Sequence, residues 1–155
     1  MRRRFSGVTA LAVVLTGSGG CAWFGGGDDK PSPVDVTITA GQRLNPDERG
    51  EALPTMFRLV LLGSAAKAEG ASYEDLYRGT KEALGEDVLA ADEVVLSPGE
   101  TTTRRIVGEK PARALLVLGV FRRPSGTSWR EIVPIERGRP RAVAFRAEDY
   151  RVERR

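Results

Sequence analysis

Cys21 is the only cysteine in a chain of 155 residues that contains no histidine. A thiol can act as a nucleophile, a metal ligand or half of a disulfide, but each of these roles needs a second group. Without histidine, neither a Cys-His nor a Ser-His-Asp arrangement can activate a nucleophile, and a zinc site would lack its usual partners. We therefore expect no metal site and no catalytic role for this thiol.

Carboxylates are the other groups that could do chemistry, and the candidates are Glu48, Glu51, Asp87, Asp92 and Glu93. Asp92 and Glu93 are adjacent in a predicted strand, so their side chains should point to opposite faces and cannot act as a pair. The glycine runs GSGG and GGG do not follow a strand and open a helix, as a phosphate-binding loop would. The sequence therefore predicts neither an enzyme nor a cofactor site.

The segment before Cys21 has the organisation of a secretory signal peptide, which we assign to residues 1–20. A positive stretch, Arg2 to Arg4, precedes an apolar run, Val8 to Leu15, and small residues lead to the cysteine. The apolar run is shorter than the roughly 20 residues that a spanning helix needs. Removing this segment leaves 21 basic and 21 acidic residues, so the basic character of the whole chain is no argument for nucleic-acid binding.

The same segment resembles the bacterial lipoprotein signal, in which small residues precede an invariant cysteine. The resemblance implies that the Cys21 thiol receives a diacylglyceryl group, that cleavage occurs just before it and that the new amine is acylated. Several acyl chains give stable membrane attachment. Ala22 stands where an aspartate would signal inner-membrane retention, so the outer membrane is favoured. An ordinary signal peptide with an incidental cysteine is the alternative. Residues 21–33 then form a flexible linker, rich in glycine.

Residues 34–155 are predicted to form one β-rich domain. Apolar and polar residues alternate in short runs separated by turn residues, which is typical of a two-sheet β-sandwich. The predicted strands fall in 34–39, 55–63, 92–97, 101–107, 112–121, 128–135, 141–146 and 149–153. The run 112–121 is the most apolar and is expected at the centre of its sheet.

One segment, residues 72–84, has helical rather than strand periodicity. Its apolar face comprises Tyr73, Leu76, Tyr77, Thr80 and Leu84. Ser72 is suited to cap the first turn, with Asp75 three residues later, and Gly85 is suited to end the helix. We therefore expect a single amphipathic helix that packs its tyrosine and leucine side chains on a sheet.

The order of these elements resembles the type VI secretion lipoprotein family TssJ, also named VasD or SciN, from Val34 to about Ile135. Four segments carry the resemblance: LNPDERGEALPTMFRLVLL, SYEDLY, LGEDVLAADEVVLSPGE and LLVLGVFRRPSGTSWREIVPI. It implies an all-β, transthyretin-like β-sandwich with one added α-helix and no catalytic activity. It further implies an outer-membrane lipoprotein that faces the periplasm and binds the C-terminal periplasmic region of TssM, completing a complex with TssL.

In that family the loop between the first two strands is implicated in the contact with TssM. Here the loop comprises Asn45, Pro46, Asp47, Glu48, Arg49, Gly50, Glu51, Ala52, Leu53 and Pro54. Its length exceeds that of a tight hairpin, and long loops on rigid scaffolds often carry binding function. A solvated connection without a partner is the alternative.

A different binding lipoprotein, such as a secretin pilotin or a carbohydrate- or ligand-binding sandwich, is the competing function. Trp129 could serve as a stacking platform for a sugar. It shares a predicted strand face with Val133 and Ile135, which favours a place in the core. The exposure of Trp129 therefore distinguishes the ligand-binding interpretation from a scaffold.

Overall fold

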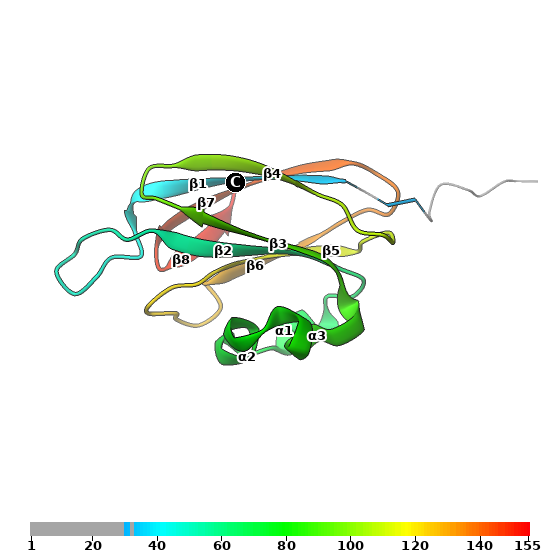
Figure 1. Ribbon diagram of the computed structural model, residues 1–155, viewed down its shortest axis with the longest axis horizontal. Helices are drawn as coiled ribbons and strands as arrows, with labels where there is room; N and C mark the ends of the chain where they lie inside the picture. Colours follow the sequence, from blue (N-terminus) through cyan, green and yellow to red (C-terminus); the bar gives the residue numbers. More distant parts are fainter. Residues whose placement is uncertain (1–29, 32) are drawn as a thin grey trace, which may run out of the picture.

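The computed structural model describes residues 30, 31 and 33–155 of the chain, and the predicted signal peptide and Cys21 lie outside them. It contains two four-stranded sheets and a group of short helices (Figure 1). The elements are β1 (Val34–Leu44), β2 (Thr55–Leu62), α1 (Ala66–Gly70), α2 (Tyr73–Arg78), α3 (Thr80–Leu84), the 3-10 turn η1 (Gly85–Asp87), β3 (Val88–Leu96), β4 (Thr101–Ile106), β5 (Ala114–Gly119), β6 (Arg130–Pro134), β7 (Arg141–Asp149) and β8 (Arg151–Arg154).

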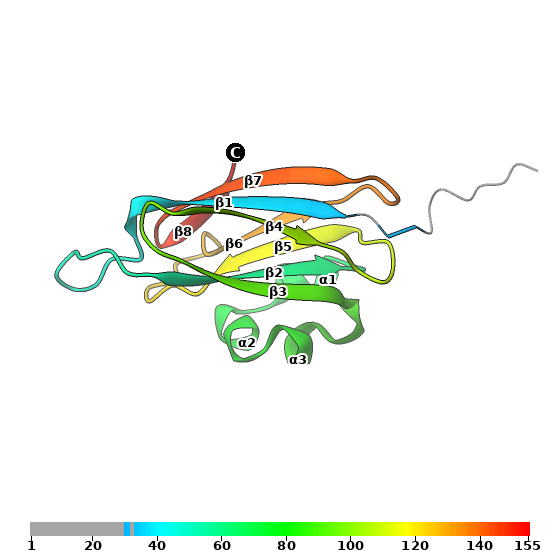
Figure 2. The ribbon, with the colours of Figure 1, turned by 45° about the horizontal axis from the view of Figure 1, so that its top comes forward.

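The two sheets pack face to face as a β-sandwich, as the sequence predicted. The first sheet has the strand order β4-β1-β7-β8 and the second has the order β3-β2-β5-β6. All neighbouring strands are antiparallel except β1 and β7, which run parallel. Figure 2 shows the second sheet lying between the first sheet and the helices, so one of its faces meets the core and the other meets the helices.

The core lies between the sheets and follows from strand alternation. Along β1, Val34, Val36 and Ile38 are fully buried while the intervening residues are half-buried. The strand β5 is buried at all six positions because the sheet core covers one face and the helices cover the other. Its place between β2 and β6 confirms the prediction that this run is central.

The prediction of one continuous helix over residues 72–84 is wrong. The segment forms two short helices, α2 and α3, that meet at Gly79, and the short helix α1 precedes them. Gly79 is extended, with φ 179° and ψ 118°, and glycine is the poorest helix former after proline. The Ser72 cap is present, because its hydroxyl accepts the backbone N–H of Asp75 at 3.1 Å.

Two arginines from the second sheet hold these helices in place. The Nη1 atom of Arg58 in β2 donates to the carbonyl oxygens of Leu76 and Tyr77, at 2.6 and 3.0 Å, at the end of α2. Arg130 in β6 donates to the carbonyl oxygens of Ala68 and Ala71 around the end of α1. Carbonyls at the C-terminal end of a helix lack partners within the helix and carry partial negative charge. The two guanidinium groups therefore stabilise the C-terminal ends of α1 and α2. No helix among the described residues is long and apolar enough to cross a membrane.

The β6 and β8 edges approach each other and close one side of the sandwich. The backbone N–H of Val152 donates to the carbonyl of Ser128 at 2.8 Å. Glu131 accepts a hydrogen bond from the backbone of Arg154, but burial and the nearby Glu153 raise the pKa of its carboxyl above the ordinary value. The C-terminal arginines thus belong to a paired strand, with Arg154 opposite Phe145 in β7.

Candidate functional site

The candidate partner-binding loop, residues 45–54, connects β1 in one sheet to β2 in the other and projects beyond the sandwich at one end (Figure 1). Three other connections lie at the same end: the β3–β4 turn, the β5–β6 loop and the β7–β8 turn. The strand register shows this, because Leu96 lies opposite Thr55, Gly119 opposite Phe57 and Asp149 opposite Leu44. We call this end the loop end.

The chain begins its first strand at the other end of the sandwich. Val34 opens β1 opposite Ile106, whereas Leu44 closes β1 at the loop end. β1 has 11 residues, which at about 3.3 Å per residue spans roughly 33 Å. The chain therefore enters β1 far from the 45–54 loop.

Asn45 anchors the loop at its beginning. It is one of two residues among those described that adopt positive φ without being glycine, with φ 46°, and asparagine tolerates this conformation better than most residues. Asn45 as a whole is 4% exposed. Its Oδ1 atom accepts the backbone N–H of Arg122 at 2.9 Å, which ties the loop to the β5–β6 loop.

Asp47 organises the loop tip. Its Oδ1 atom accepts the backbone N–H groups of Arg49 and Glu51 at 2.8 and 2.9 Å. The Asp47 N–H donates to the Glu51 carbonyl, and the Gly50 N–H donates to the Asp47 carbonyl. Gly50 has φ 85°, a conformation that glycine adopts without strain. The tip is therefore a closed turn whose shape is set before any partner binds.

The predicted site residues separate into supports and a solvent-facing tip. Asn45 is buried, and Pro46, Asp47, Ala52 and Leu53 are half-buried. The Pro46 carbonyl accepts the Tyr150 hydroxyl at 2.7 Å, which adds a link to the β7–β8 turn. The residues free to meet a partner are Glu48, Arg49, Gly50, Glu51 and Pro54, which are exposed. The tip therefore carries more acid than base.

Basic residues that the sequence analysis did not assign to the site lie beside the loop. Arg122 and Arg123 in the β5–β6 loop are exposed. At the base of the loop, Arg43 forms an ion pair with Asp149 at 3.2 Å. The Arg146 guanidinium and the Arg43 N–H hold the pKa of Glu148 below its ordinary value. Sequence alone could not place these groups together, because they come from β1, the β5–β6 loop and β7, which are far apart in the sequence.

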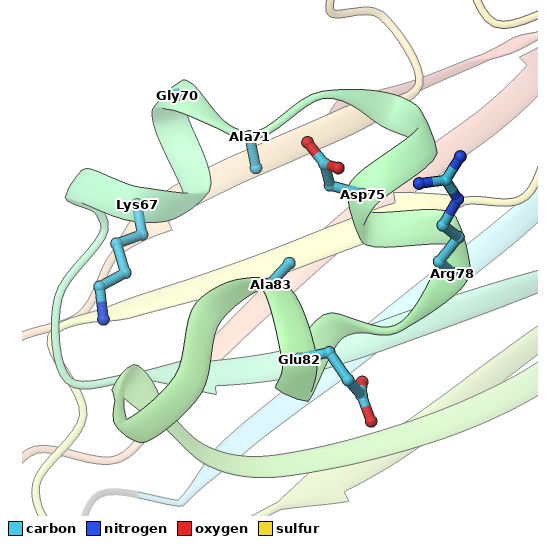
Figure 3. Close-up of a pocket in the computed structure, with 7 residues that line it drawn as sticks. All are labelled: Lys67, Gly70, Ala71, Asp75, Arg78, Glu82 and Ala83. Atoms are coloured by element: carbon cyan, nitrogen blue, oxygen red, sulfur yellow. The ribbon is translucent and has the colours of Figure 1, made fainter.

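A depression of about 410 Å³ lies among the three helices (Figure 3). Its charged lining residues are Lys67, Asp75, Arg78 and Glu82. Lys67 already pairs with Asp87 at 3.1 Å, and Asp75 is used in the Ser72 cap. Trp129, for which a place in the core was favoured over a role as a sugar platform, is 3% exposed and packs edge-on against Tyr73, with 5.2 Å between ring centroids. Neither feature supports a carbohydrate-binding sandwich.

The adjacent carboxylates of Asp92 and Glu93 have different partners. Glu93 accepts Arg58 Nε at 2.7 Å on the outer face of the second sheet. Asp92 faces Arg104 of β4, with 3.8 Å between the charged atoms. The two carboxylates therefore serve different ion pairs, as their adjacent positions in one strand require. Within residues 30, 31 and 33–155, no group of three or more acidic, cysteine or histidine side chains is arranged to hold a metal ion.

Comparison with known proteins yields one family and several similar structures. A family model described as type VI secretion lipoprotein, VasD, EvfM, TssJ, matches residues 32–152. A search of curated proteins found no match. The T6SS lipoprotein TssJ1 from Pseudomonas aeruginosa is similar with a TM-score of 0.71 at 24% identity, over 81% of this chain and 98% of that chain.

Two further structures share the fold. Lip from Serratia marcescens, a membrane-bound component of the type VI secretion system, has a TM-score of 0.68 at 20% identity, over 80% of this chain and 97% of its own. A chain in the structure of the T6SS protein TssM C-terminal domain (869-1107) from EAEC has a TM-score of 0.69 at 21% identity, over 79% of this chain and 99% of that chain. At these identities the likeness establishes a common fold.

Proposed function

The chain belongs to the type VI secretion lipoprotein family, and from this premise we propose how it works as an assembly protein of the secretion membrane complex. Acylated Cys21 anchors it in the outer membrane, with the folded domain facing the periplasm. The domain holds a TssM-type periplasmic domain, partly through the 45–54 loop, and so connects indirectly to TssL. The protein acts by binding and carries out no reaction.

The observation that supports this proposal is that the chain enters the folded domain at the end opposite the 45–54 loop. The chain passes into β1 at Val34, and the loop lies at the far end of the same strand. A domain joined to the membrane through a flexible linker at the first end can present the second end to a partner in the periplasm. The pre-formed tip at Asp47 supports the same role, because a loop that is already ordered loses less conformational entropy when it binds.

Charge reversal at the tip tests the proposal. The variant Glu48→Lys/Glu51→Lys changes two exposed side chains and leaves the residues Asn45 and Asp47 in place. Isothermal titration calorimetry with the TssM-type periplasmic domain should show at least tenfold weaker binding, and wild-type binding should depend on salt because rim charges are screened.

The matched control is Glu86→Lys/Glu109→Lys, which makes the same charge change at exposed positions away from the loop end. This control should bind like the wild type. Equal weakening in both variants would indicate a general effect of net charge, and unchanged binding in the tip variant would remove the loop from the interface.

A further inference from the structure

Three large hydrophobic residues among those described are exposed, and they are not spread evenly over the surface. They are Tyr77 at 53%, Val95 at 61% and Val107 at 49% exposure. Val107 follows β4 at the end where the chain enters the domain. Val95 lies on the second sheet near the loop end, opposite Met56, and the Tyr77 carbonyl is bonded to Arg58 of the same sheet.

Strand register and hydrogen bonds bring these two residues to one surface. Val95 in β3 lies directly opposite Met56 in β2. Arg58 and Glu93 form the next outward-facing pair along the same strands, joined at 2.7 Å. Arg58 also donates to the Tyr77 carbonyl at 3.0 Å. We define the outer-face patch as Met56, Tyr77 and Val95, arranged around the Arg58–Glu93 ion pair.

The Tyr77 ring is held in position although the residue is about half exposed. It stacks on Tyr73 with 5.9 Å between ring centroids and 17° between planes. Tyr73 is itself fixed, because its hydroxyl donates to the Phe121 carbonyl at 2.8 Å. An exposed aromatic ring that is already ordered loses little entropy on binding, and such rings often contribute strongly to protein interfaces.

The patch is continuous with the loop end. Met56 follows the exposed loop residue Pro54 by two positions, and the Val120 N–H donates to the Met56 carbonyl at 2.9 Å. The 45–54 loop has ten residues, whereas a stable interface uses roughly 20–30 residues on each side. A partner that binds the loop must therefore also cover neighbouring surface. The centre of an interface is usually apolar, with polar residues around it.

We propose that the outer-face patch is the apolar centre of the surface covered by the TssM-type periplasmic domain, with the acidic loop tip at its rim. This inference rests on the proposed function above. The partner surface would present an apolar side chain against Met56, Tyr77 and Val95. It would carry basic groups facing Glu93, Glu48 and Glu51, because these carboxylates are exposed.

Two substitutions in different elements test the patch. Val95→Lys introduces a charge on β3, and Tyr77→Ala removes the ring from α2. Each should weaken binding of the full lipidated chain in detergent to the TssM-type periplasmic domain by at least tenfold in calorimetry. Val107→Lys is the matched control, since it makes the same change at a similarly exposed valine at the opposite end, and it should bind like the wild type. Thermal unfolding of each variant identifies any loss of the fold.

The outcomes separate this inference from the proposed function. If the tip variant Glu48→Lys/Glu51→Lys weakens binding and the two patch variants do not, the patch inference is overturned and the function stands. If the wild type does not bind the TssM-type domain, both fail. Light scattering on the wild type adds a third outcome. A dimer that Val95→Lys dissociates would assign the patch to a second copy of this chain and overturn the inference.

Discussion

The side-chain oxygen of Asn45 accepts the backbone N–H of Arg122 at 2.9 Å, although the two residues are 77 positions apart. This hydrogen bond fixes the β1–β2 loop to the β5–β6 loop. It therefore sets how the exposed acidic tip of one loop is placed beside the exposed arginines of the other.

Replacing Asn45 should destabilise the domain and weaken partner binding together. Asn45→Ala removes the acceptor for a part-buried N–H and places alanine at φ 46°. The combined cost is about 2 kcal/mol in the free energy of unfolding. Asn45→Gly relieves the backbone strain but still lacks the acceptor, so it should cost about 1 kcal/mol. Urea denaturation measures the free energy of unfolding of the two variants. Equal costs for the two variants would show that the hydrogen bond, and not the backbone, accounts for the effect.

Removing the Arg58 guanidinium should loosen α2 selectively. Its side chain is 16% exposed and bonds two carbonyls at the end of α2 as well as Glu93. We expect Arg58→Met to cost about 2 kcal/mol, because hydrogen bonds from a charged donor are lost and the carbonyls of a helix end are left unpaired.

Hydrogen exchange provides the readout, with faster exchange in residues 73–84 than in the strands. The control is Arg105→Met, which removes an exposed pair with Asp35 on the other sheet. Exposed ion pairs contribute little to stability, so the control should leave exchange in the helices unchanged. Uniform acceleration across the domain in Arg58→Met would contradict a local role.

The raised pKa of Glu131 predicts a specific pH dependence of stability. Burial disfavours the charged carboxylate in the folded state, so the folded protein binds this proton more tightly than the unfolded chain does. The stabilising contribution is present at low pH and is lost as the pH rises through the folded-state pKa.

Glu131→Gln removes this titration, and its amide oxygen can still accept the N–H of Arg154. Relative to the wild type, the variant should therefore gain stability as the pH is raised from about 4 to 7. Glu148, whose pKa is lowered, has the opposite dependence, but it is present in both proteins and cancels in the difference. Denaturation curves whose difference does not change with pH would contradict this assignment.

Lipidation at Cys21 predicts where the protein is found. Cys21→Ser should move the protein from the membrane fraction to the soluble periplasmic fraction, because attachment depends on the acyl chains. Mass spectrometry should find lipid on the first residue of the mature wild-type chain. The purified variant should bind the TssM-type domain as tightly as the wild type does. An unmodified wild-type chain that begins elsewhere would contradict the assignment.

The sequence by itself determined the approximate positions of the strands and their organisation as a two-sheet sandwich, whereas the order and pairing of the strands came from the structure. Apolar alternation in runs such as Val34, Val36 and Ile38 leaves one way to bury a single face, and the all-apolar run of β5 fits only a strand covered on both sides. The capped start of α2 at Ser72 was also predictable, because capping involves atoms only three residues apart.

Tertiary structure decided the continuity of the helix and the composition of the site. Tyr77 was predicted to pack on the sheet, but it is about half exposed at the end of α2. Asn45 was predicted as a contact residue. It is buried, and its side-chain oxygen accepts the backbone N–H of Arg122 in the β5–β6 loop, so it supports the loop from inside. The spacing of apolar residues indicates which face of a strand or helix is apolar. It does not record which distant residues meet that face, since this depends on how the two sheets and the helices pack.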